Sequence, residues 1–183
     1  MIVAYLKDRS SLSACSLVSH NWLISARPLL FKQITLRNQN RANERVKFNP
    51  FHTFVHARSS ANVTQYIQRL NIRGTSGSLM FFVKMSDLEA MVSRLPALRS
   101  IYFSNIVVTP RTGFVAHNLT AKPLDVLHIT QTYFFRKNGT VDPADPLSIT
   151  NSFLELLSMF SVVKTLVLVY AQYRQLEDSY VDF

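Results

Sequence analysis

The stretch FKQITL, residues 31–36, contains the pattern that decides the fold of this 183-residue chain. Phe31, Ile34 and Leu36 follow the order apolar-x-x-apolar-x-apolar. Side chains two positions apart in an extended chain point to the same face. The pattern therefore predicts a short strand that buries one side and leaves the other side free.

The same six-residue pattern returns four times along the chain. The copies are IQRLNI at 67–72, LRSIYF at 98–103, LDVLHI at 124–129 and VKTLVL at 163–168. Their central apolar residues are Ile34, Leu70, Ile101, Leu127 and Leu166. Five copies predict an internal repeat in which each unit supplies one strand.

Helical patterns lie between the copies. They occupy FNPFHTFVHARSS at 48–60, SDLEAMVSRLP at 86–96 and DPLSITNSFLELLSMFS at 145–161. The second has an apolar stripe at Leu88, Met91, Val92 and Leu95. Ser86 and Glu89 have the spacing of a capping box, and Asp145 with Pro146 predicts a helix start.

The alternation of helices and strands predicts a mixed α/β fold. Polar or small-residue segments at 37–50 and 74–79 read as loops within it. The order helix, turn, short strand and loop is typical of an irregular leucine-rich-repeat-like solenoid with short parallel strands. A generic α/β domain with buried strands is the alternative.

The stretch DRSSLSACSLVSHNWLISARPLLF at 8–31 has a different, helical pattern. Its stripe at steps of three and four consists of Leu12, Cys15, Val18, Trp22, Ala26 and Leu29. Asp8 is a predicted N-cap, and the weak helix formers at 19–21 predict a break. Pro28 has no amide donor and is expected to begin a new short turn.

The segment SLSACSLVSHNWLISARPLLFKQITL, residues 11–36, resembles the second half of an F-box as found in fungal F-box proteins. The matching positions are Leu12, Cys15, Val18, Trp22, Leu30 and Phe31. Residues 1–7, MIVAYLK, resemble the end of the first F-box helix, although the family's Leu-Pro and acidic opening is missing. The resemblance implies a partial F-box-like helical segment at 1–32, followed by a degenerate leucine-rich-repeat-like region at 33–183.

The resemblance also implies a function. F-box proteins dock on a Skp-type adaptor of a cullin ubiquitin ligase and hold a protein substrate through their repeats. The residues expected to contact the adaptor are Ile2, Leu6, Leu12, Cys15, Val18 and Trp22. An interface role and a core role are equally open for this set, and Trp22 is among its best candidates for core. The missing opening favours the alternative of a repeat scaffold without ligase docking.

The net charge of +9 comes from the first part of the chain. Arginine pairs well with oxyanions, so a basic run predicts contact with a substrate or another acidic partner. The run consists of Arg37, Arg41, Arg45 and Lys47. A basic nucleic-acid-binding module is a further alternative, with little support because the run lacks interleaved aromatic residues.

No sequence motif points to catalysis, a cofactor or a metal. His52 and His56 are four positions apart, but two ligands without a third make a poor metal site. The single Cys15 excludes an internal disulfide and suits a reducing compartment. The chain also lacks a signal pattern and an apolar run of about 20 residues. We therefore expect a non-enzymatic protein of the cytoplasm or nucleus, with no membrane partner.

Overall fold

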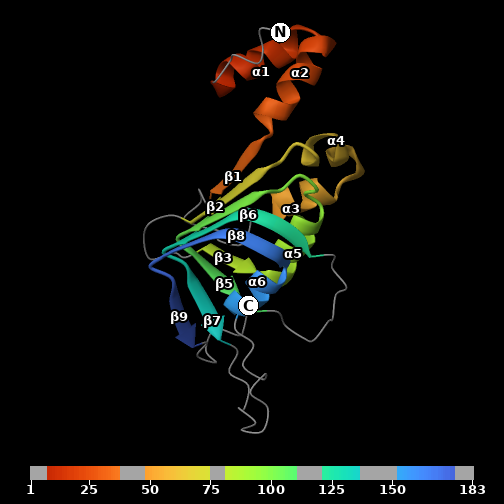
Figure 1. Cartoon of the computed structure of the whole chain (residues 1–183). Coiled ribbons are helices and arrows are strands. Elements are labelled where there is room, and N and C mark those ends of the chain that lie inside the picture. The colour runs from red at the N-terminus through yellow and green to blue at the C-terminus, as the bar shows by residue number, and fades with distance from the viewer. Residues whose placement is uncertain (1–7, 38–47, 75–80, 111–120, 137–151, 176–183) are drawn as a thin grey trace.

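The computed structural model describes residues 8–37, 48–74, 81–110, 121–136 and 152–175 (Figure 1). The predicted mixed α/β class with parallel strands is confirmed. The α-helices are α1 (Arg9–Val18), α2 (His20–Leu30), α3 (Phe48–His56), α4 (Ala61–Thr64), α5 (Met85–Ser93) and α6 (Ser152–Ser158). A short 3-10 helix, η2 (Arg58–Ser60), joins α3 to α4.

Each copy of the six-residue pattern forms one strand of a five-stranded parallel sheet. In spatial order the strands are β1 (Gln33–Arg37), β2 (Arg69–Arg73), β4 (Ser100–Ser104), β6 (Lys122–Thr130) and β8 (Phe160–Val169). The equivalent positions of the copies are register partners across the sheet: Ile34, Leu70, Ile101, Leu127 and Leu166. The predicted repeat is therefore confirmed for its strands.

A second parallel sheet was missed by the sequence analysis. Its strands are β3 (Phe81–Lys84), β5 (Ile106–Thr109), β7 (Tyr133–Arg136) and β9 (Gln172–Gln175). Each follows a strand of the first sheet, so the prediction of one strand per repeat is wrong. The runs are short and rich in β-branched or aromatic residues, and Ile106, Val107 and Val108 are fully buried.

A column of corner residues turns the chain from the first sheet into the second. Asn105, Gln131 and Tyr170 occupy it with φ values of 53°, 48° and 55°. Gly74 is at the equivalent position, and its amide donates to the carbonyl of Ser104 at 2.9 Å. Positive φ is uncommon for residues other than glycine, so these corners give little sequence signal.

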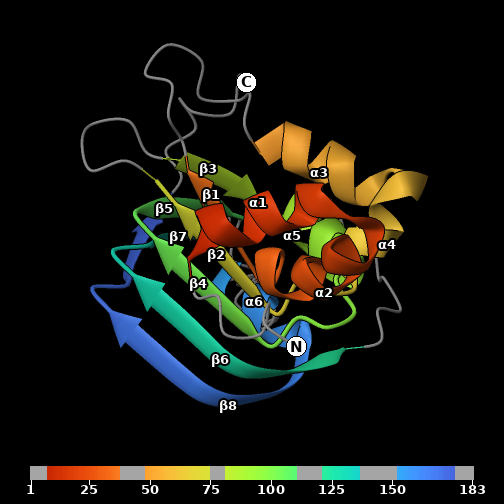
Figure 2. The same ribbon diagram turned by 90° about the horizontal axis from the view of Figure 1, so that it is seen from above.

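Helices α3, α5 and α6 lie on the inner side of the first sheet, and α6 packs beside β8 (Figure 2). The predicted apolar stripe is confirmed, since Leu88, Met91 and Val92 of α5 are buried, as is Leu95 just beyond the end of the helix. The predicted capping box is wrong. The helix begins at Met85, and its N-cap residue Lys84 makes no side-chain capping bond. Asp145 and Pro146 lie outside the described residues.

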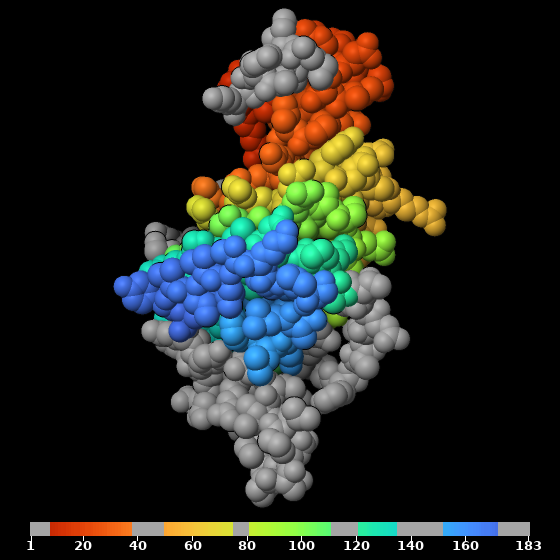
Figure 3. All heavy atoms as spheres, viewed as in Figure 1, coloured from red at the N-terminus to blue at the C-terminus, as the bar shows by residue number. Residues whose placement is uncertain are grey.

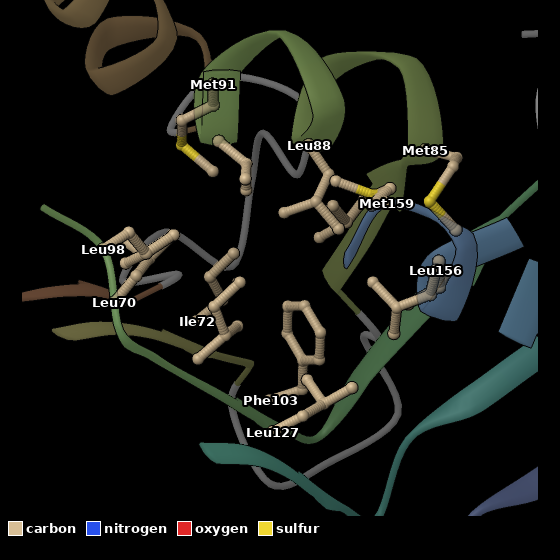
Figure 4. Packing of buried hydrophobic residues seen from close by; sticks show 14 of the residues in the cluster. Leu70, Ile72, Met85, Leu88, Met91, Leu98, Phe103, Leu127, Leu156 and Met159 are labelled. Atoms are coloured by element: carbon tan, nitrogen blue, oxygen red, sulfur yellow. The ribbon is translucent and has the colours of Figure 1, made fainter. Parts of the chain in front are cut away.

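The core fills the space between the two sheets and the helices (Figure 4). Leu88 and Met91 of α5 lie opposite Phe103 of β4, and Leu156 of α6 closes one side. Lys122 ties β6 to α5, because its Nζ donates to the carbonyls of Val92, Ser93 and Leu95 at 3.1–3.4 Å. A cation at those carbonyls also suits the C-terminal end of the helix dipole.

The first two helices form a hairpin above β1 (Figure 1). The predicted break is confirmed, because Ser19 is extended between α1 and α2 and its Oγ accepts from the amide of Trp22 at 3.3 Å. The turn predicted at Pro28 is wrong, since α2 continues through it to Leu30. Because proline has no amide, the carbonyl of Ile24 lacks the donor that a helix normally supplies from residue 28.

Gly74→Ala should destabilise the protein by about 2–3 kcal/mol through steric conflict. A Cβ at this position would lie 1.9 Å from the carbonyl oxygen of Asn105 and 3.3 Å from Cβ of Phe81. Urea unfolding followed by circular dichroism measures the change. Ser104→Ala, beside the same corner, is the control and should change stability by less than about 0.5 kcal/mol. Equal urea midpoints for Gly74→Ala and wild type would contradict the corner geometry.

Candidate functional site

The α1–α2 hairpin forms a lobe with a small core of its own. Leu12 of α1 and Ala26 of α2 are buried between the two helices, and Leu30 packs against them. This cluster is separate from the large core beneath the sheet. In the space-filling view the hairpin stands at one end of the molecule (Figure 3).

Much of the hairpin's apolar surface is exposed. Leu17 is 85% exposed, Val18 67% and Ile24 51%. Trp22 and Leu29 are exposed as well, and helical spacing places both on the same side of α2 as the buried Ala26. An uncovered apolar surface of this kind is typical of an interaction site.

The residues predicted to meet an adaptor are therefore divided by the structure. Leu12 is only 5% exposed and belongs to the hairpin core, Cys15 is half-buried, and Val18 and Trp22 are exposed. Of the two roles left open for Trp22, the structure favours the exposed one, since 39% of the residue is exposed. Ile2 and Leu6 lie outside the described residues.

The sequence analysis missed two exposed apolar residues on the hairpin, Leu17 and Ile24. Leu29 belongs to the predicted stripe but is exposed as well. Leu17 and Ile24 are off the predicted stripe, and their only sequence signal was hydrophobicity at positions that the stripe assigns to solvent.

A two-residue link joins the hairpin to the first sheet. The amide of Phe31 donates to the carbonyl of Arg27 at 3.0 Å and ends α2. The carbonyl of Lys32 accepts from the amides of Gln68 and Arg69 at 2.9 and 3.0 Å. Both link residues are thus held by backbone hydrogen bonds, one to the hairpin and one to β2.

The second candidate surface is the outer face of the five-stranded sheet, defined by the alternate residues that point away from the core. Three aligned columns of side chains form it. They are Gln33, Arg69, Ser100, Val126, Thr165; Thr35, Asn71, Tyr102, His128, Val167; and Arg37, Arg73, Ser104, Thr130, Val169. None of these fifteen residues is acidic.

Three arginines make one end of the outer face basic. Arg37 and Arg73 are neighbours across β1 and β2, and Arg69 lies two positions before Arg73. All three are exposed, and among the described residues none makes an ion pair. The guanidinium of Arg69 lies 5.2 Å from the ring centroid of Tyr102, and its Nη1 donates to Oε1 of Gln33 at 3.4 Å.

The predicted basic run is only partly placed at this end. Arg37 lies on the outer face, whereas Arg41, Arg45 and Lys47 fall outside the described residues. Arg69 and Arg73 were missed because they come from another repeat. Their sequence signal was their position on either side of the inward residues Leu70 and Ile72.

The middle of the outer face is aromatic and polar. The rings of Tyr102 and His128 lie side by side with centroids 5.4 Å apart. Nδ2 of Asn71 donates to Oγ1 of Thr35 at 3.1 Å. These contacts hold side chains of four neighbouring strands in place.

The other end of the outer face is aliphatic. Val126 lies on β6, and Val167 and Val169 lie on β8. The β8 side is uncovered in Figure 3. At the rim, Nζ of Lys164 lies 2.8 Å from Oδ1 of Asp125, and this hydrogen bond lowers the pKa of Asp125.

The described residues include no group of three or more His, Cys, Asp or Glu side chains placed to hold a metal. The rings of His52 and His56 have centroids 4.4 Å apart and are tilted by 47° to each other. Desolvation, followed by the charges of His52 and Arg94, lowers the pKa of His56. Over the same ranges of the chain, every helix is too short or too polar to cross a bilayer.

Comparison with protein-family models, with curated proteins and with solved structures finds no significant match.

The start of α1 gives a pH prediction. The Ser10 hydroxyl and the Ser11 amide donate to Oδ1 of Asp8 at 2.5 and 2.7 Å, which lowers the pKa of Asp8 from 3.8 to about 2. Because this pKa is lower in the folded state, the cap stabilises α1 fully above pH 3.8 and is lost as the pH falls towards 2. Amide exchange of Ser11 and Leu12 should speed up over that range.

Asp8→Asn is the matched control for this pH effect. Asparagine keeps a capping oxygen and does not titrate, so the pH dependence of exchange at Ser11 should disappear beyond the intrinsic rate. Asp8→Ala should show fast exchange at every pH. An unchanged acid response in Asp8→Asn would contradict the assignment to Asp8.

Proposed function

We propose that the chain is a non-catalytic, F-box-like substrate adaptor. Its hairpin docks on a Skp-type adaptor of a cullin ubiquitin ligase, and its repeat region, of irregular leucine-rich-repeat type, binds a protein substrate. The proposal places the protein in the cytoplasm or nucleus. Its sequence basis is the resemblance of residues 11–36 to the second half of an F-box.

One structural observation supports this proposal most. Two surfaces of different character lie on either side of the two-residue link: an exposed apolar hairpin and an open sheet face. A small hairpin with only Leu12 and Ala26 buried gains stability when a partner covers its remaining apolar side chains. The open face presents fourteen exposed or partly exposed side chains to a second molecule, since Asn71 alone among the aligned residues is buried.

The repeat architecture agrees with the proposed class. Consecutive strands are neighbours in chain order, their inner apolar residues are aligned, and helices cover the inner side. Each unit contacts mainly the next one, as in solenoid proteins. The second sheet adds a feature that the simple strand-and-helix repeat does not require.

The docking proposal is tested by Leu17→Asp combined with Val18→Asp. Both side chains are exposed, so the hairpin should still fold, while two charges at an apolar contact should weaken adaptor binding by at least about tenfold. Co-expression with a Skp-type adaptor, followed by affinity capture and titration calorimetry, measures the loss. Leu12→Asp is unsuitable because Leu12 is core.

Leu154→Asp is the matched control, because Leu154 is 60% exposed on α6, far along the chain from the hairpin. It should bind the adaptor as wild type does. Absence of binding by the wild-type chain, or equal binding by the double variant, would reject adaptor docking and favour a repeat scaffold.

A further inference from the structure

Within the described ranges, no acidic side chain pairs with the arginine end of the outer face, which consists of Arg37, Arg69 and Arg73. Like charges on adjacent strands repel each other. Arg69 is also held in place by the Tyr102 ring and by Gln33. A partner carboxylate would therefore meet a guanidinium that is already ordered, which lowers the entropy cost of binding.

The valine end of the same face has the opposite character. A sheet face that only meets water normally carries polar side chains, yet Val126, Val167 and Val169 point outward from β6 and β8. Their neighbours Thr130 and Thr165 add methyl groups to the same end. Solubility alone explains the arginines but not this aliphatic end.

The distance between the two ends sets the length of a ligand. Neighbouring strands are about 4.8 Å apart, so β2 and β8 are separated by about 14 Å across three strand spacings. An extended peptide rises about 3.3 Å per residue, and about four residues therefore bridge the two ends. The rings of Tyr102 and His128 lie between them.

We propose that the outer face binds an extended peptide segment that carries acidic residues at one end and aliphatic residues at the other. The carboxylates contact Arg37, Arg69 and Arg73, the aliphatic residues pack on Val126, Val167 and Val169, and the segment crosses the strands. This inference rests on the proposed function and names its substrate class. A nucleic acid fits less well, because three valines neither neutralise phosphate nor stack on bases.

The binding test uses a fluorescent synthetic peptide with about three glutamates, about four small polar residues and about three aliphatic residues, titrated with the full chain by anisotropy. One control peptide replaces the glutamates by glutamine, and a second replaces the aliphatic residues by serine. Both should bind more weakly than the complete peptide. Equal binding of all three peptides, or none by the complete one, would overturn the proposal.

Arg69→Gln combined with Arg73→Gln tests the basic end. Loss of two charge-assisted contacts should weaken binding of the complete peptide at least about tenfold and leave the glutamine peptide unaffected. Arg58→Gln combined with Arg94→Gln removes the same charge from exposed arginines on the helical side and should bind as wild type. An equal loss of peptide affinity in both double variants would show that the effect depends on net charge alone, and it would overturn the proposed site.

Val167→Ser tests the aliphatic end. It should weaken binding of the complete peptide more than binding of the serine peptide. An unlabelled oligothymidine competitor distinguishes the other class of ligand. If it displaces the peptide and binds more tightly, the face is a nucleic-acid site and the proposal is wrong. Leu17→Asp with Val18→Asp should keep full peptide affinity, so failure of adaptor docking and failure of peptide binding give separate results.

Discussion

Strands β1, β2, β4 and β6 each place two buried or partly buried apolar side chains on the inner side of the sheet, level with those of their neighbours. The equivalent Leu166 and Leu168 of the edge strand β8 are 43% and 48% exposed. Ile34, Leu70 and Ile101 lie in one row, and Leu36, Ile72 and Phe103 lie in the next. A register slip of one residue would turn these side chains towards water. The alignment of the repeats is therefore strongly fixed, and with it the alignment of every outward residue.

The outward residues do not contribute to packing of the core in the same way. Their character changes along the sheet from Arg69 and Arg73, through Tyr102 and His128, to Val167. The core holds this series in place but does not dictate it, because any residue that tolerates extended backbone fits those positions. Because packing does not require these outward residues, their chemical character indicates what the outer face contacts.

The sequence predicts the part of the fold that depends on local pattern. The five strands and the stripe of α5 follow from the spacing of apolar residues. The second sheet depends on corners at Asn105, Gln131 and Tyr170, which have positive φ although none of them is a glycine, so the sequence gives no signal for these turns. The outer face was missed for a related reason. Arg37 and Arg73 are distant in sequence and become neighbours only when the strands align.

The hairpin shows how a break alters a correct periodicity. The stripe from residue 12 to 29 was followed as one series, but the extended Ser19 starts α2 in a new direction, and Val18 and Trp22 become exposed. The connection from the hairpin to β1 is only two residues long, and the carbonyl of Lys32 is hydrogen-bonded to the start of β2. A flexible linker would allow a partner on the hairpin and a ligand on the outer face to move independently. Here the short link keeps the hairpin close to the first sheet.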